Sequence, residues 1–255
     1  MTSATTASQF SIVDWAAWQP GVLSHEQWQN WQSQGVTEVS EQLPDFSAIP
    51  PMLRRRLPKL GRVAVSLMGG LVDAHGALPI VYASQHCELH RTTGILDDIA
   101  AGNPVSPAAF SMAVHNSMVG VFSIHKGITS NITAIAAGTQ GLVPVLLEAV
   151  GLLADGHDQV LCVMCDEPVP SRYAGYEPHP AMPYALAFVL AAGNRHSLCC
   201  QPGGASDNAN ASDNDQDQDQ DDTPQALTLI RYLLSESKGL HLSHNRSGWL
   251  IEKTE

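Results

Sequence analysis

A short turn bounded by two glycines is the segment of this sequence best suited to chemistry. Gly138-Thr139-Gln140-Gly141 follows an apolar strand predicted over 132–137 and precedes a strongly apolar helix predicted over 141–154. A strand–turn–helix junction presents the turn residues at a helix N-terminus, where the helix dipole stabilises a nucleophilic anion. The turn contains no thiol, and its only hydroxyl is that of Thr139. The junction therefore suits a nucleophile but offers no cysteine thiol to act as one.

The cysteines and histidines elsewhere give weaker signals. Cys162 and Cys165 form a CxxC motif inside a predicted strand, and no second ligand pair at zinc spacing accompanies them. We therefore expect buried structural cysteines. His86 and His90 lie four residues apart with Cys87 between them, which a metal site could use, but a polar loop is the favoured interpretation. We predict no metal ion.

Apolar strands alternate with helices along the whole chain, which predicts a single α/β domain over 1–255. The expected strands are 10–18, 78–83, 132–137, 159–165 and 184–192, the expected helices are 24–35, 53–67, 92–101, 108–125, 141–154 and 226–234, and a terminal hairpin is expected over 240–252. The segment 203–224 is rich in Asp, Asn, Gln and Ser, cannot form a core, and is predicted to be a disordered loop.

Composition excludes several classes of partner. The formal net charge is −12, and seven Asp between residues 206 and 222 account for much of it. Nucleic acid is therefore not an expected partner, because phosphate binding needs a basic face. No apolar run reaches the ~20 residues of a membrane helix, so no membrane insertion is expected. An odd number of cysteines, 5, and a polar N-terminus without a secretory signal favour a reducing cytoplasm.

Several segments resemble the N-terminal half of the β-ketoacyl synthases. These are a Pro-rich stretch at 104–107, the stretch 110–124 with Asn116 and Gly120 spaced as Asn-x-x-x-Gly, and the turn 138–141. In that family, similar segments occur in the same order, and the turn carries the pattern Ala-Cys-small-small-Gly. The match extends from about 78 to 170 and is similar in particular to the short chain-length-factor-type subunits of aryl polyene and related pathways.

The resemblance implies a thiolase-like half, in which helices are layered around a mixed β-sheet. It also implies a dimer, because the strand before the turn pairs with its counterpart across the dimer axis in that family. An apolar edge strand left unpaired is an aggregation hazard, which gives the strand at 132–137 a physical reason to need a partner. We expect that partner to be a full-length β-ketoacyl-ACP synthase, in a heterodimer.

Two departures from the family bear on catalysis. The nucleophilic cysteine of the family falls on Gly138, or on Thr139 by an ungapped count from Asn116, and neither residue is a thiol. The catalytic histidines of the family lie in a second, homologous half, and the present sequence ends before that half would begin. We therefore expect no catalytic residue, no cofactor, and a chain-length-factor-like role in which the subunit shapes the acyl tunnel.

The resemblance also implies which residues line the acyl tunnel or the dimer interface. These are Phe110, Met112, His115, Asn116, Met118, Val119, Phe122, Ile132, Ile135 and Gln140. Enlarging Met118 or Val119 to Trp is expected to shorten the product. A simpler interpretation of His115 is a satisfied core or interface histidine.

Two alternatives remain open from the sequence. The chain could be an active acyltransferase or ketosynthase-like enzyme that uses Thr139, or a cysteine such as Cys165, as its nucleophile. It could instead be a docking module for an acidic acyl carrier protein, with a basic helix face that is otherwise only solvated. The residues of that face are Arg54, Arg55, Arg56, Lys59 and Arg62.

Overall fold

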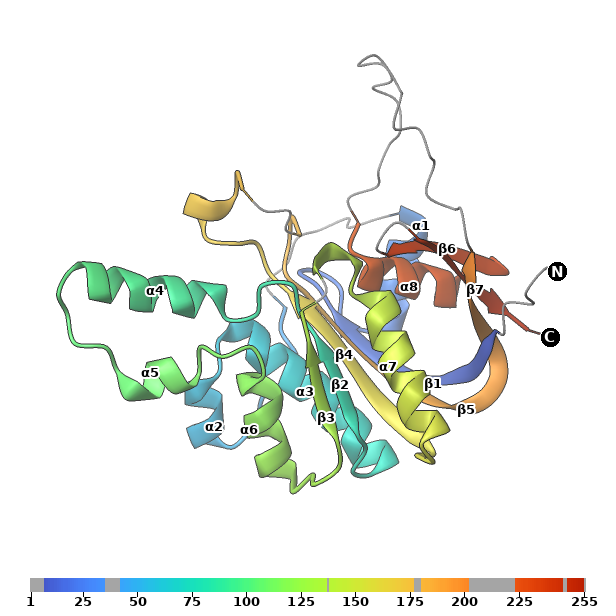
Figure 1. Cartoon of the computed structure of the whole chain (residues 1–255), viewed down its shortest axis with the longest axis horizontal. Coiled ribbons are helices and arrows are strands. Elements are labelled where there is room, and N and C mark those ends of the chain that lie inside the picture. The colour runs from blue at the N-terminus through green and yellow to red at the C-terminus, as the bar shows by residue number, and fades with distance from the viewer. Residues whose placement is uncertain are drawn as a thin grey trace, which may run out of the picture.

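The computed structural model describes residues 7–34, 42–136, 138–176, 180–201, 223–244 and 247–254 (Figure 1). The strands are β1 (Ser8–Trp18), β2 (Ile80–Ala83), β3 (Ile132–Ile135), β4 (Gln159–Asp166), β5 (Tyr184–Gln201), β6 (Gly239–His244) and β7 (Ser247–Lys253). The helices are α1 (His25–Gln34), α2 (Pro51–Arg56), α3 (Lys59–His75), α4 (Leu89–Ala100), α5 (Pro107–Ser111), α6 (Ser117–Lys126), α7 (Leu142–Ala154) and α8 (Gln225–Leu234). Two short 3₁₀ helices are η1 (Gly138–Gln140) and η2 (Ser171–Tyr173).

The strands of the described residues form one mixed sheet in the order β3-β2-β4-β5-β7-β6, and β1 also pairs with β5. The strands β3, β2 and β4 are parallel to one another, whereas the other pairs are antiparallel. The carboxyl ends of the three parallel strands therefore meet at one edge of the sheet. The predicted single α/β domain with helices around a mixed sheet is confirmed.

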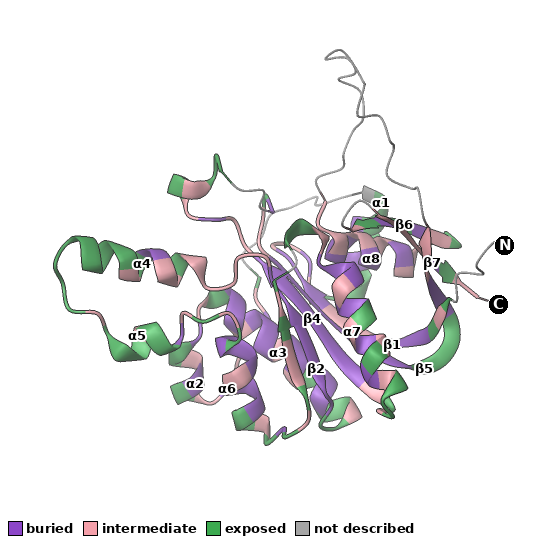
Figure 2. Cartoon of the chain, in the orientation of Figure 1, coloured by how far each residue is buried: buried purple, intermediate pink, exposed green. Residues whose placement is uncertain are grey.

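Two hydrophobic clusters cover the two faces of the sheet. Along β2, Ile80 and Tyr82 contribute to the cluster under α2, α3 and α6, while Val81 and Ala83 contribute to the cluster under α7 and α8. This alternation follows from the two-residue period of a strand. Because both faces of β2 and β4 are covered, their residues are buried, except for the partly exposed Gln159 at the start of β4 (Figure 2).

The prediction of one helix over 53–67 is wrong, because the structure has two helices there, α2 and α3. Leu57 is extended, with ψ of 137°, and Pro58 forms the N-cap of α3. A proline disfavours the helical conformation in the preceding residue and lacks the N–H that a continuous helix needs. Pro58 therefore ends the first helix and begins the second.

The prediction of one helix over 108–125 is also wrong, since the structure has two separate helices there, α5 and α6. Ser106 caps α5 by accepting a hydrogen bond from the Ala109 N–H at 3.3 Å. Between the helices, the Ser117 hydroxyl donates to the Met112 carbonyl at 3.1 Å. These contacts stabilise a break that hydrophobic periodicity alone did not indicate.

Most other predicted elements are present with shifted ends. The strand predicted over 184–192 continues to Gln201, because its second half pairs with β7. The strand predicted over 132–137 ends at Ile135. Apart from Thr223 and Pro224, the predicted disordered loop at 203–224 lies outside the described residues. No helix in the described ranges has the length and apolar character needed to span a bilayer.

Candidate functional site

The Gly-bounded turn joins β3 to α7 at the edge where the parallel strands end. Gly138 has φ of +62°, in the left-handed region that favours glycine, and both Gly138 and Thr139 are exposed. Gly141 passes close over β4, since a Cβ added there would lie 3.3 Å from the Met164 Cε. The predicted strand–turn–helix junction is therefore present, and its exposed hydroxyl is that of Thr139.

The N-terminus of α7 is capped by a neutral side chain from another helix. The backbone N–H of Leu142 donates to the Oε1 of Gln225 at 3.2 Å, and the Nε2 of Gln225 donates to the carbonyl of Ser243 at 3.0 Å. The Nε2 of Gln140 donates to the Ser243 hydroxyl at 3.3 Å. First-turn N–H groups have no partner inside their own helix and can otherwise stabilise an anion. Here the amide oxygen of Gln225 accepts the hydrogen bond of one of these N–H groups.

Three cysteines, in β4 and in the loop after β2, have thiols that resist ionisation. Cys162 and Cys165 lie inside β4, and burial raises the pKa of both thiols. Cys87 follows β2, and burial raises its pKa to about 11. Its Sγ donates to the carbonyl of His115 at 2.9 Å. These thiols therefore resist ionisation to the thiolate that acyl transfer requires.

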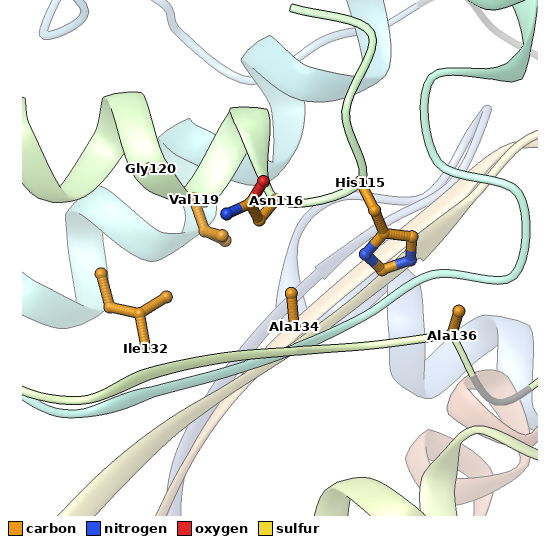
Figure 3. Close-up of a pocket in the computed structure, with 7 residues that line it drawn as sticks. All are labelled: His115, Asn116, Val119, Gly120, Ile132, Ala134 and Ala136. Atoms are coloured by element: carbon orange, nitrogen blue, oxygen red, sulfur yellow. The ribbon is translucent and has the colours of Figure 1, made fainter.

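A pocket of about 600 Å³ lies between α6 and β3 (Figure 3). The residues that line it are His115, Asn116, Val119, Gly120, Ile132, Ala134 and Ala136. The two polar side chains, His115 and Asn116, come from the segment just before α6, and the wall formed by β3 is apolar. The pocket therefore combines an apolar wall along β3 with a polar side, and the two contribute about equally to its surface.

The strand that forms one wall of the pocket is an edge strand. Among the described strands, β3 pairs only with β2. The carbonyls of Asn131 and Ile135 accept hydrogen bonds from Ile80 and Ser84. Because successive residues of a strand point their backbone groups in opposite directions, the N–H and C=O groups of Ile132 and Ala134 point away from β2. This edge carries no charged side chain that would block another strand.

His115 is positioned at the pocket by contacts with the loop after β2. Its Nε2 lies 2.9 Å from the Ser84 carbonyl, and its ring lies 5.4 Å from that of Tyr82. Since a carbonyl can only accept, the Nε2 carries a hydrogen and donates it to Ser84. His115 is thus a satisfied histidine that also lines the pocket.

Asp166, at the end of β4, holds that loop in place. Its carboxylate accepts hydrogen bonds from the hydroxyl of Ser84 at 2.7 Å, the N–H of Gln85 at 2.7 Å and the hydroxyl of Tyr184 at 3.0 Å. Burial raises the pKa of Asp166, while these donors act in the opposite direction. A buried carboxylate with this many donors is a structural anchor.

The structure brings together only part of the predicted tunnel or interface set. His115, Asn116, Val119 and Ile132 share the pocket. The remaining residues lie elsewhere: Phe110 is 63% exposed on α5, Met112, Met118 and Phe122 are buried in the cluster under α3, Ile135 packs on the cluster under α7, and Gln140 contacts Ser243.

Three residues that line the pocket, Gly120, Ala134 and Ala136, were not among the predicted tunnel or interface residues. They could have been found from their spacing, because Gly120 lies one helical turn after Asn116 and Ala134 and Ala136 alternate with Ile132 on one face of the strand. Within the described ranges, no group of three His, Cys, Asp or Glu side chains could hold a metal ion.

The comparisons with known proteins agree with this geometry. Residues 28–251 match the family model described as "Beta-ketoacyl synthase, N-terminal domain". No curated protein matches the chain. Among solved structures, the chain is 28% identical to a chain of the ketosynthase (ApeO) in complex with its chain length factor (ApeC) from Xenorhabdus doucetiae, with a TM-score of 0.81 over 96% of this chain and 99% of that chain.

More distant structures share the fold. The ishigamide ketosynthase/chain length factor is 15% identical with a TM-score of 0.61, over 74% of this chain and 65% of that chain. A chain of AntDE:AntF, a type II PKS acyl-carrier protein in complex with its ketosynthase, is 10% identical with a TM-score of 0.64, over 98% of this chain and 100% of that chain. With a model match that covers most of its length, the chain belongs to the family of the β-ketoacyl synthase N-terminal domain.

Proposed function

We propose that the chain is a non-catalytic, chain-length-factor-like partner of a full-length β-ketoacyl-ACP synthase. In this proposal the synthase performs the decarboxylative condensation of malonyl units carried on an acyl carrier protein. The present chain completes the dimer and shapes the end of the acyl tunnel. The assembly would work in the cytoplasm on aryl polyene or similar polyketide chains.

The observation that carries the proposal is the state of the junction between β3 and α7. The turn offers Gly138 and Thr139 where the family has a cysteine, and the first N–H of α7 is bonded to Gln225. A threonine hydroxyl is a poor nucleophile unless a base activates it, and a capped helix end contributes less to stabilising an anion. The alternative of an enzyme that uses Cys165 is disfavoured by the burial of that thiol.

Two observations support a role as the partner of a synthase: the similarity to a solved complex and the open edge of β3. The solved structure at 28% identity is a ketosynthase in complex with its chain length factor. The open edge of β3 has unpaired backbone groups at Ile132 and Ala134, which another strand can satisfy. The wall of the adjacent pocket formed by β3 is apolar, so a partner that covered the pocket would enclose an apolar wall that an acyl chain could lie against.

Co-expression tests the proposal. The tagged chain would be produced with a full-length β-ketoacyl-ACP synthase from the same organism, purified through the tag, and measured by light scattering during gel filtration. The expected result is a complex whose mass equals one synthase plus one 27.3 kDa chain.

The purified chain without the synthase is the sample that tests for catalysis. The chain alone should neither take up an acyl group from acyl carrier protein nor release CO₂ from malonyl thioesters. A chain that purifies without the synthase, or that turns over malonyl thioesters by itself, would refute the proposal.

A further inference from the structure

Helix α7 carries a single charged side chain, and that charge lies at the open edge of the sheet. Apart from Glu148, the 13 residues of α7 have no polar side chain. The Oε1 of Glu148 accepts a hydrogen bond from the hydroxyl of Thr133 at 2.8 Å. Thr133 belongs to β3, which among the described strands pairs only with β2. The one carboxylate of an otherwise apolar helix is therefore placed beside the unpaired strand edge.

The folded chain alone does not explain this charge. Glu148 is half-buried, and the ion pairs found among the described residues all involve other carboxylates. A neutral amide in its place would accept the same hydrogen bond from Thr133. A half-buried carboxylate loses its remaining water when another protein covers it, which is costly unless a cation or a hydrogen-bond donor replaces that water. The charge therefore bears on what can cover this edge.

The surface around Glu148 is suited to contact with another protein. Leu147 is 41% exposed, and Gly151, which follows Glu148 by one turn on the same side of α7, is also exposed. Next to them, the backbone groups of Ile132 and Ala134 point away from β2. An apolar helix face beside an open strand edge fits a partner that adds both a strand and a helix.

A second copy of this chain is one such partner, and the open edge defines how it would pair. Two copies joined through the same edge are related by a two-fold axis, so their β3 strands run antiparallel. In the register that uses every outward-pointing group, Ile132 of each copy exchanges hydrogen bonds with Ala134 of the other. The two Thr133 residues then face each other, with Cα atoms about 4.5 Å apart.

This register brings two like charges together. Thr133 pairs with Val81, which lies in the cluster under α7, so Thr133 points toward α7 and its Glu148. Each Thr133 hydroxyl already donates its hydrogen to the Glu148 of its own copy and has none for the other. The two carboxylates come within about 10 Å, the Debye length at 0.1 M salt, and the second copy excludes part of the water that would screen them. Self-pairing is therefore opposed by repulsion between the two Glu148 side chains.

We propose that Glu148 prevents the chain from pairing with its own copy and selects a partner that presents a basic side chain to this carboxylate. Such a side chain replaces the lost water with an ion pair when the partner strand lies beside β3. The identification of the partner as the synthase rests on the proposed function, whereas the exclusion of self-pairing rests on the open edge and the charge alone.

Self-association of the purified chain tests the first half of this inference. Sedimentation velocity at several concentrations measures it in dilute salt. Glu148→Gln removes the charge and keeps an acceptor for Thr133, so it should strengthen self-association at least about tenfold. Equal self-association of the native chain and Glu148→Gln, whether both are monomers or both are dimers, would overturn the inference.

A charge exchange tests whether an opposite charge is what this site accepts. Native chain carrying a fluorophore would be titrated with unlabelled Glu148→Lys, and fluorescence anisotropy would follow binding. The mixed pair, with one Glu and one Lys across the axis, should associate at least about tenfold more tightly than either chain with its own copy. A mixed pair no tighter than the two self-pairs would also overturn the inference.

The matched control is Asp155→Lys, which makes the same charge change at an exposed residue directly after α7. Asp155 lies seven residues beyond Glu148, about 10 Å further along the helix axis. This variant should change self-association and the mixed pairing by less than about twofold. Thermal melts of every variant establish that the chains are folded.

Binding to the synthase tests the second half. Glu148→Lys should weaken association with the synthase at least about tenfold, and Asp155→Lys should leave it within about twofold. A synthase that binds native chain and Glu148→Lys equally would overturn the selection of a basic partner and leave the proposed function standing. If the native chain forms no synthase complex, the proposed function fails, and the two self-association experiments still decide the role of Glu148.

Discussion

The Oε1 atom of Gln225 lies 3.2 Å from the backbone nitrogen of Leu142 and accepts its hydrogen bond. This contact joins α8 to the first residue of α7, immediately after the turn in which the family carries its nucleophile. An amide oxygen here satisfies a backbone donor without adding charge. The contact therefore stabilises the first turn of α7 directly after Gly138 and Thr139.

Replacing Gln225 with Ala should lower the free energy of unfolding by about 1 kcal/mol, because the Leu142 N–H loses its acceptor at a helix N-terminus. Urea unfolding followed by circular dichroism measures the change. Thr228→Ala, on the same helix, is the control and should cost less than about 0.5 kcal/mol, since its hydroxyl makes only a 3.4 Å bond to Pro224. Equal losses for the two variants would contradict the capping role.

Enlarging Gly120 should shorten the product of the complex. Gly120 lines the pocket, and a Cβ added there meets nothing within 4 Å, so the first atom of a larger side chain has space at this position. Met118 is a poorer choice, because its side chain is buried in the core and Trp would overpack it. Mass spectrometry of the released acyl chains measures the length.

Gly70→Leu is the control for the pocket, since Gly70 is also a helical glycine with open space at its Cβ. Both substitutions should raise helix stability by roughly 0.5–1 kcal/mol, but only Gly120→Leu should change the product. An intact complex that makes chains of unchanged length with Gly120→Leu would show that the pocket does not limit the product.

Proline at Ala134 should prevent association without unfolding the chain. The N–H of Ala134 points away from β2, so its loss leaves the pairing of β2 and β3 intact while removing a donor from the open edge. We expect affinity for the synthase to fall at least about tenfold, by gel filtration of mixtures at several concentrations. Ala134→Val keeps the N–H and should still associate. Assembly of the proline variant at native affinity would rule out strand pairing at this edge.

The thiols should react in an order set by burial. Burial raises the pKa of Cys87 to about 11, so about one part in a thousand is thiolate at pH 8. Cys162 and Cys165 are buried within β4. Iodoacetamide at pH 8 should therefore modify the half-buried Cys199 and Cys200 first, and raising the pH toward 11 should speed the labelling of Cys87. Peptide mass spectrometry against a urea-unfolded sample measures the order, and early labelling of Cys165 would contradict the structure.

Much of the fold could be predicted from the sequence where local pattern and packing agree. The buried strand at Gln159–Asp166 and the apolar helix at Leu142–Ala154 were found because their composition suits burial on both sides. Pro58 is visible in the sequence as a residue that interrupts helices, and the prediction of one continuous helix over 53–67 did not take it into account. The break before α6 is accompanied by a local contact of Ser117 with Met112 and by a contact of His115 with Ser84, 31 residues earlier in the chain, and no local pattern reveals the second.

The pocket was only partly predictable for a related reason. Phe110 and Met118 were expected to line the acyl tunnel or the dimer interface, and neither lines this pocket, because Phe110 is exposed on α5 and Met118 is in the core. The lining includes small residues, Gly120 and Ala134, because space at a surface is created by side chains that do not fill it. The capping by Gln225 joins residues 83 positions apart in sequence, so it required the folded chain to be seen.

The most direct test of the account is the mass of each subunit in the working complex. The complex would be incubated with malonyl- and acyl-loaded carrier protein, quenched during turnover, and measured by intact-protein mass spectrometry. We predict that the acyl group is found on the synthase and that the mass of this chain stays at its native value. An acyl adduct on this chain, at Thr139 or at any of its cysteines, would contradict the central claim that it assembles with the synthase but does not perform the chemistry.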